Sequence, residues 1–163
     1  MNATMHDWEQ TFRAWSKPSS ETEQAKAENA ERMIREAIWE HDALAEMEIE
    51  VFAQGSYKNN TNVREDSDVD ICVCLMRPFF ADFSMAEGIT ERDAGLSDSN
   101  YTYEEFKSEV GAALVSKFGQ AGVTRGDKAF DVHENSYRVD ADVVACLEHR
   151  RYTTQERHGR GGN

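Results

Sequence analysis

Two aspartates open the strongest apolar run of the sequence, and their spacing suggests metal-dependent phosphoryl chemistry. Asp68 and Asp70 stand two positions apart at the start of a strand-like segment. Side chains two apart on a strand share a face, so both carboxylates converge while Val69 points away. Paired carboxylates need a cation to offset their repulsion, and hard oxygen ligands suit Mg²⁺ or Mn²⁺. The alternative is a solvated, acidic end of a strand.

A glycine-serine pair precedes these aspartates at a suggestive distance. Gly55-Ser56 ends a strand-like run, and 11 residues separate it from Asp68. Glycine lets a phosphate approach the backbone, and the serine hydroxyl with nearby N–H groups can bind phosphate oxygens. Gly-Ser alone is an ordinary turn, but Gly-Ser followed at this distance by Asp-x-Asp predicts a phosphate site beside the carboxylates.

A third carboxylate is expected from another strand. The segment 137–147 reads as a strand, and alternation places Asp140 and Asp142 on one of its faces. Both are unusual in a strand that leads into an apolar run. A carboxylate in such a place usually has a partner, and a shared metal ion is the natural one. The residue pattern alone leaves both aspartates as candidates.

The charge balance favours a small substrate over a long polyanion. The 163 residues carry a net charge of −13, and residues 149–163 hold four arginines against one glutamate. A protein that holds nucleic acid by its phosphates needs a basic face, so binding of duplex nucleic acid or tRNA is disfavoured. No apolar run reaches the roughly 18 residues of a membrane span and no signal pattern opens the chain, so a cytoplasmic location is expected.

The three cysteines are expected to be reduced residues of the core. Cys72 and Cys74 lie in the apolar strand, and Cys146 lies in a second apolar run. Cys-x-Cys without a second Cys or His pair at ligand spacing is a weak zinc signal. Cysteine in apolar runs behaves as a small hydrophobe.

Two helices are expected to support these strands, after a short aromatic-rich helix near residues 8–15. Apolar residues at helical spacing predict a long helix over 21–45, which a capping box at Ser20 opens. The same capping pattern at Thr102 opens a second helix, and Gly119 can end it.

The strand pattern completes the expected fold. Strands are predicted over 49–53 and 68–76, with Pro78 ending the second and a surface loop over 79–100. Further strands are expected over 129–133, 137–147 and 151–154. This order predicts an α+β fold, a small mixed sheet backed by helices.

These motifs resemble those of the DNA polymerase β-like nucleotidyltransferases. That superfamily carries Gly-Ser or Gly-Gly, a spacer of similar length, Asp-x-Asp/Glu, and a later Asp on a neighbouring strand. Segments 54–57, 67–71 and 139–144 look most like the branch of cyclic GMP-AMP synthase, oligoadenylate synthase and the bacterial cyclic-oligonucleotide synthases. That branch often reads Asp-Val-Val-Pro-Ala at its third carboxylate. The motif here keeps Asp-Val-Val and lacks the proline, so the resemblance selects Asp142 over Asp140.

The resemblance implies an enzyme that uses nucleoside triphosphates, such as ATP or GTP, with two Mg²⁺ or Mn²⁺ ions. The product would be a cyclic or linear oligonucleotide messenger, made in bacterial antiphage defence. The alternatives are nucleotidyl transfer to a small-molecule or protein hydroxyl, and an inactive nucleotide-binding or regulatory module. The implied catalytic metal ligands are Asp68, Asp70 and Asp142, and the implied nucleotide-binding residues are Gln54, Gly55, Ser56 and Ser67.

The resemblance covers roughly residues 21–152, which correspond to the front half of a family enzyme. Such enzymes normally continue into a helical C-terminal half that completes the nucleotide pocket. We therefore expect an N-terminal helical segment over 1–20, a catalytic core over 21–155, and a Gly/Arg-rich loop over 156–163 at a truncation point.

Overall fold

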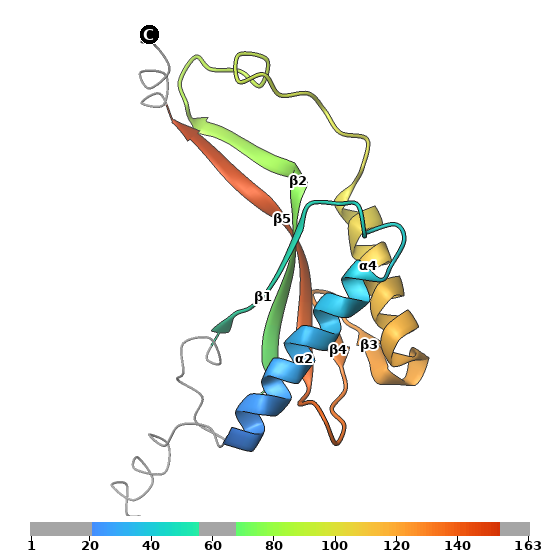
Figure 1. Ribbon diagram of the computed structural model, residues 1–163. Helices are drawn as coiled ribbons and strands as arrows, with labels where there is room; N and C mark the ends of the chain where they lie inside the picture. Colours follow the sequence, from blue (N-terminus) through green and yellow to red (C-terminus); the bar gives the residue numbers. More distant parts are fainter. Residues whose placement is uncertain (1–20, 56–67, 154–163) are drawn as a thin grey trace, which may run out of the picture.

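The computed structural model describes residues 21–55 and 68–153, which form a five-stranded mixed sheet with helices on one face (Figure 1). The strand order is β1-β2-β5-β4-β3. This architecture confirms the predicted α+β class. The elements are α2 (Glu21–Trp39), β1 (Ile49–Ala53), β2 (Val69–Met85), α4 (Tyr103–Phe118), a 3₁₀ turn η1 (Gln120–Gly122), β3 (Val123–Arg125), β4 (Phe130–Val132) and β5 (Ala141–Thr153).

The central pair of the sheet, β2 and β5, is parallel, whereas every other pair is antiparallel. A parallel pair requires a crossover connection. Here the crossover contains an irregular segment over 86–102, helix α4, and the hairpin of β3 and β4. The hairpin then adds to the far edge of β5, so the crossover itself extends the sheet.

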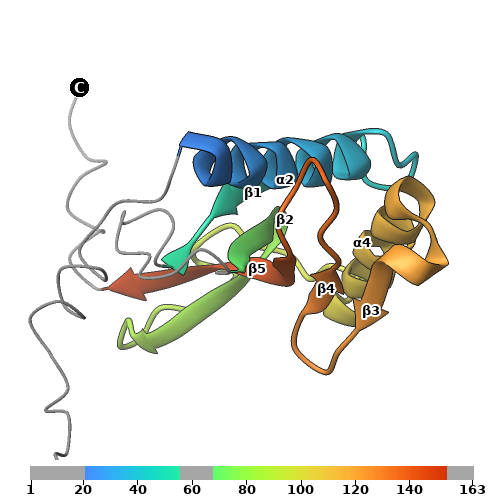
Figure 2. The same ribbon diagram turned by 90° about the horizontal axis from the view of Figure 1, so that it is seen from below.

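The described helices α2 and α4 bury one face of the sheet, and neither lies on the other face (Figure 2). The odd-numbered residues over 69–75 of β2 and 141–147 of β5 lie in the core with the apolar sides of α2 and α4. Alternation along each strand places the even-numbered residues on the opposite, open face. Both helices and both central strands contribute side chains to this core. Its buried residues include Ile34, Ile38, Val69, Ile71, Val73, Phe106, Leu114, Ala141 and Val143. No described helix is long and apolar enough to cross a membrane.

Helix α4 begins and ends at the predicted caps. The Thr102 hydroxyl accepts the Glu105 backbone N–H at 3.2 Å, and the Glu105 carboxylate accepts the Thr102 backbone N–H at 2.7 Å. These reciprocal bonds form a capping box. At the other end Gly119 has a φ of 80°, and its N–H donates to the Val115 carbonyl at 2.8 Å. Glycine adopts this left-handed backbone without steric cost, so it ends the helix as expected.

Helix α2 is shorter than predicted: it ends at Trp39 and not near residue 45. The chain then turns, and the Leu44 and Ala45 N–H groups both donate to the His41 carbonyl at 2.9 Å. The turn carries Leu44 into the core, where it is 1% exposed. Burying a leucine stabilises the fold by about 1.5–3 kcal/mol, which outweighs another helical turn. The predicted helix over 8–15 and the Ser20 cap lie outside the described residues.

Strand β2 runs through the proline that was predicted to end it. The strand continues to Met85 across a cis Arg77–Pro78 peptide. Its register with β5 shifts between Leu75 and Phe80. Proline has no N–H to give to a ladder, and an irregularity of this kind is where strands tolerate it. The loop prediction is therefore wrong for residues 79–85 and correct for 86–100.

The last third of the chain also differs from the prediction. Strand β5 begins at Ala141, after a turn closed by the bridge between Asn135 and Arg138. Buried Arg138 packs its guanidinium over the Phe118 ring at 4.7 Å, which draws this turn onto α4 before the strand begins. The separate strand expected over 151–154 is the end of β5, and the three-residue β3 was too short to be recognised.

Beyond the proline, β2 and β5 run on together past the helices as a two-stranded distal ribbon, residues 78–85 and 149–153 (Figure 1). Stacked ring pairs link its strands, with ring centroids 5.5 Å apart for Phe80 and His149 and 4.6 Å apart for Phe83 and Tyr152. The ribbon therefore depends on cross-strand side-chain pairs and not on the helix-covered core.

Gly111 sets the distance between α4 and the sheet. A Cβ at this position would meet the Phe130 ring at 2.8 Å, and Phe130 is 1% exposed. Helix propensity alone predicts that Gly111→Ala stabilises the protein by about 1 kcal/mol. Overpacking typically costs about 1–3 kcal/mol, so we expect a net destabilisation of about 1 kcal/mol in urea unfolding. Ser108→Ala, at an exposed position of the same helix, should be neutral or slightly stabilising. Equal gains in both variants would contradict this packing.

Candidate active site

Three aspartates lie side by side on the open face of the sheet. Asp70 on β2 is the register partner of Asp142 on β5, and Asp142 is also the register partner of Asp131 on β4. Asp70 and Asp131 are exposed and Asp142 is half-buried. Their strand neighbours are buried on the helix side, for example Val69 and Val143. The row therefore follows from strand alternation combined with the register of three neighbouring strands.

Gly55 approaches this row from the end of β1. The Gln54 N–H donates to the Asp70 carbonyl at 2.7 Å, which ties the two chain segments together. Gly55 has a φ of +67°, and a Cβ at this position would collide with the Asp70 Oδ2 atom. Only glycine meets both constraints without strain. The spacing argument thus correctly predicted that Gly55 lies beside Asp70; Ser56 and Ser67 lie outside the described residues.

Burial and the charge of neighbouring carboxylates raise the pKa of two aspartates of the site, Asp68 and Asp142. Removal from water is the largest cause that raises the pKa of Asp68 and of Asp142 above the usual aspartate value. The next cause is the charge of Asp140 for Asp68 and the charge of Asp131 for Asp142. Within the described residues, the neighbouring charges that act on these two groups are all negative. The site therefore carries unbalanced negative charge, which a bound cation would offset.

Asp140 and Asp142, which the sequence left as rivals, occupy different environments. The Asp140 Oδ1 atom accepts the backbone N–H of Glu134, and its own carbonyl accepts the Val69 N–H at 3.0 Å. These bonds fix the turn that leads into β5. In the described part of the chain, the Asp142 carboxylate has no hydrogen-bond donor of this kind. Asp140 is thus engaged in the turn, whereas Asp142 faces the open side next to Asp70.

The described residues contain no preformed metal cage. In 21–55 and 68–153, no three His, Cys, Asp or Glu side chains converge closely enough to hold a metal ion. The carboxylates stand in a row across separate strands instead. Their chemistry nevertheless fits a divalent cation, because hard oxygen donors with unbalanced charge are the ligands that Mg²⁺ prefers.

Asp131 was missed by the sequence reasoning. The signal was the pattern Phe130-Asp131-Val132, in which an aspartate alternates with two buried residues of a predicted strand. Its position next to Asp142 depends on the register between β4 and β5, which no local pattern reveals. The His133 Nε2 atom lies 3.7 Å from an Asp131 carboxylate oxygen.

Only one of the three cysteines is a core residue as predicted. All three are free and lie at even-numbered positions, on the face that carries Asp70 and Asp142. Cys72 is buried, whereas Cys74 and Cys146 are only half-buried. The prediction of reduced core residues is confirmed for Cys72, which is free and 2% exposed. For Cys74 and Cys146 the thiols are free as predicted, but the prediction that they are core residues is wrong.

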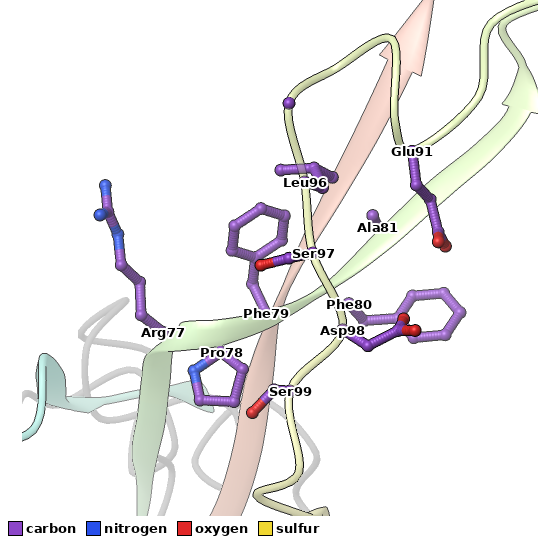
Figure 3. Close-up of a pocket in the computed structure, with 11 residues that line it drawn as sticks. Arg77, Pro78, Phe79, Phe80, Ala81, Glu91, Leu96, Ser97, Asp98 and Ser99 are labelled. Atoms are coloured by element: carbon purple, nitrogen blue, oxygen red, sulfur yellow. The ribbon is translucent and has the colours of Figure 1, made fainter.

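A cavity of about 400 Å³ lies away from the carboxylate row, between the distal ribbon and the loop 91–99 (Figure 3). It begins at Arg77, seven residues beyond Asp70 along β2. The close-up shows the Glu91 and Asp98 carboxylates directed toward the side of the Phe80 ring. The apolar part of its wall consists of Pro78, Phe79, Phe80 and Leu96. This cavity and the aspartate row are therefore separate features.

The comparison with protein families identifies the class. Residues 32–121 match the family model described as the nucleotidyltransferase domain. These residues include β1, Gly55 and the Asp68/Asp70 pair, which are the first two parts of the site described above. The chain belongs to the nucleotidyltransferase domain family.

Within that family, the chain is similar to curated cyclic dinucleotide synthases. It is 62% identical over 146 residues to the cyclic dipyrimidine nucleotide synthase CdnE of Legionella pneumophila, an alignment that covers 90% of this chain and 50% of the relative. It is 45% identical over 153 residues to the CdnE of Cecembia lonarensis, which covers 94% of this chain and 51% of that relative. The chain thus spans about half the length of these relatives.

Solved structures agree with this placement. The Rhodothermus marinus CdnE c-UMP-AMP synthase, solved with Apcpp and Upnpp, matches 95% of this chain and 49% of its own, with 34% identity and a TM-score of 0.73. The Elizabethkingia meningoseptica CdnE cyclic dinucleotide synthase, solved with GTP and Apcpp, matches 85% and 43%, with 33% identity and a TM-score of 0.59. The resemblance to bacterial cyclic-oligonucleotide synthases is therefore confirmed.

Asp142→Asn should stabilise the metal-free protein at neutral pH. Because the folded pKa of Asp142 is raised, its ionisation opposes folding, and stability is lost as the pH rises through that pKa. In EDTA at about pH 7 the substitution should raise the melting temperature by on the order of 2–4 °C. Near about pH 3 the wild-type carboxyl is protonated in both states, so the difference should vanish.

The matched control is Asp98→Asn, an exposed loop residue. It should leave the melting temperature unchanged at both pH values in scanning calorimetry. An Asp142→Asn protein that melts at or below the wild-type temperature at neutral pH would show that the carboxylates do not repel one another.

Proposed function

We propose that this chain is the nucleotide-binding, carboxylate-bearing part of a cyclic dinucleotide synthase. The observation that carries the proposal is the pairing of Asp70 with Asp142 in one register, with Gly55 against Asp70. The family and its relatives supply the reaction class, nucleotidyl transfer. In this proposal, phosphate binds at the turn around Gly55, next to the negative oxygen ligands of Asp70 and Asp142.

The proposed reaction is attack by a ribose hydroxyl on the α-phosphorus of a nucleoside triphosphate. One P–O bond forms, the bond to the β-phosphate bridging oxygen breaks, and pyrophosphate leaves. The absence of a side chain at Gly55 leaves room for the Asp70 carboxylate beside β1. Gln54, Gly55, Ser56 and Ser67 are proposed to contact the phosphate oxygens. Such catalysis consists mainly of positioning and charge neutralisation.

Asp68, Asp70 and Asp142 are the residues proposed to hold two Mg²⁺ or Mn²⁺ ions. When bound, the ions would neutralise the triphosphate and lower the pKa of the attacking hydroxyl. The contribution of the chain itself is to hold these carboxylates at fixed positions on neighbouring strands. Parallel pairing keeps Asp70 and Asp142 adjacent, and Asp131 adds a further negative charge at the edge of the row.

We propose pyrimidine nucleotides as substrates, in place of the ATP or GTP expected from the sequence. The two relatives described above, 62% and 45% identical, are both named cyclic dipyrimidine nucleotide synthases. A second candidate function is nucleotide binding without turnover. The chain spans about half the length of these relatives, so nucleotide binding is tested separately from turnover.

The direct test is incubation of the purified chain with each labelled triphosphate and Mn²⁺, with products resolved after phosphatase treatment. A phosphatase-resistant product from UTP or CTP supports the proposal. A product made only from ATP or GTP would overturn the pyrimidine assignment. Calorimetric titration with a non-hydrolysable UTP analogue, with and without Mn²⁺, tests the second candidate, since metal-dependent binding without product is its signature.

Asp70→Ala should abolish product formation and metal-dependent nucleotide binding. Losing one carboxylate of a metal site reduces the rate by orders of magnitude, roughly 10³-fold or more. Circular dichroism should be unchanged, because the Asp70 side chain is exposed. The matched control Asp98→Ala should keep both activities. Product formation by the Asp70→Ala protein at the wild-type rate would overturn the assignment of this site.

Asp140 and Asp142 can be separated with one pair of variants. Asp142→Ala should lose turnover to a degree similar to Asp70→Ala, without loss of melting temperature. Asp140→Ala removes the acceptor of the Glu134 N–H, so it should lower stability by about 1 kcal/mol while it retains metal-dependent binding. The reverse pattern would make Asp140 the third ligand.

A further inference from the structure

All three cysteines of the chain meet on the open face of the central strand pair. Cys74 on β2 is the register partner of Cys146 on β5, and Cys72 lies two positions earlier on β2. The Sγ atoms of Cys72 and Cys146 are 2.8 Å apart, close enough for an S–H···S hydrogen bond. Residues 74 positions apart in the sequence thus have touching thiols.

The short distance between the two sulfur atoms brings a covalent bond between these thiols within reach. Cys146 is the register partner of Cys74, so Cys72 meets it diagonally across the two strands. Diagonal neighbours have Cα atoms about 7–8 Å apart, a little beyond the usual disulfide range of about 4.4–6.8 Å, so the bond requires some movement of the backbone. A disulfide has an S–S length of about 2.05 Å, so the sulfur atoms need to close by less than about 1 Å. Rotation about the side-chain bonds, with a small adjustment of the two strands, supplies such a movement.

We propose that Cys72 and Cys146 form a thiol-oxidation site that reacts with hydrogen peroxide to give a disulfide between β2 and β5. In the first step one thiol sulfur attacks a peroxide oxygen, becomes a sulfenic acid, and releases water. In the second step the other thiol displaces the hydroxyl from that sulfur and releases a second water. The two thiols lose two electrons and two protons in total, and the peroxide is reduced to water.

The difference in exposure between the two thiols indicates which of them reacts first with peroxide. Cys146 is half-buried and is reached by peroxide, whereas Cys72 is 2% exposed and is shielded from it. Cys72 therefore acts as the resolving thiol, which captures the sulfenic acid of Cys146 before further oxidation. Cys74 contributes a third thiol directly opposite Cys146, but the sulfur contact selects Cys72 as the partner.

This inference does not rest on the proposed synthase activity, and its test needs no turnover. The reduced chain is freed of reductant, treated with peroxide, unfolded, alkylated and weighed by mass spectrometry. We expect the number of alkylated thiols to fall by two, with the change reversed by dithiothreitol. Non-reducing electrophoresis should show a monomer, because the bond forms within one chain.

Serine variants identify the pair. The Cys74→Ser chain should still lose two alkylatable thiols, whereas the Cys146→Ser chain should lose none to a disulfide. Because Cys146 is only half-buried, its serine variant should fold, and circular dichroism checks this. A second readout is thermal: the oxidised wild-type chain should melt higher than the reduced chain, by on the order of a few degrees, and Cys146→Ser should show no such difference.

Three results would overturn the proposal. One is the loss of the crosslink in the Cys74→Ser chain, which would assign the bond to Cys74. Another is the accumulation of sulfinic acid on Cys146 with no crosslink, which would show that Cys72 does not reach it. The third is a disulfide found only between two chains.

Discussion

The parallel register between β2 and β5 is the constraint on which the rest of this structure depends. It places Asp70 opposite Asp142, two carboxylates that repel each other, and it does so because Ile71 and Val143 pair one step further along. Those two residues are buried against the helices. Burial of apolar side chains on one face therefore sustains an unfavourable concentration of charge on the other, which is how a fold can hold a site ready for a cation.

The same register determines what could be inferred from the sequence. Local rules were sufficient for the Thr102 capping box, for the Gly119 stop and for the side of the strand on which Asp70 lies, because each depends on neighbours within four residues. Gly55 was placed correctly because a short spacer joins it to the Asp-x-Asp motif. The spacing of functional residue types thus carried information that periodicity alone did not.

The errors concern features that arise only when distant segments meet. Pro78 interrupts a ladder whose partner, β5, lies about 70 residues later, so its position in a register shift was invisible locally. The start of β5 depends on the packing of Arg138 over Phe118. Asp131 joins the aspartate row only through the pairing of β4 with β5. Tertiary contacts overrode or completed the local pattern in each case.

The distal ribbon has a consequence for the cooperativity of unfolding. β1 pairs with β2 only over residues 71–75, and β4 pairs with β5 only over 141–143, so among the described strands the ribbon has no flanking partners. Two-stranded ribbons are marginally stable in water. Amide hydrogens of the ribbon should thus exchange with solvent through local opening, while those of the flanked segments exchange only when the whole domain opens. One pair of continuous strands would then contain two units of different stability, with their boundary near Pro78.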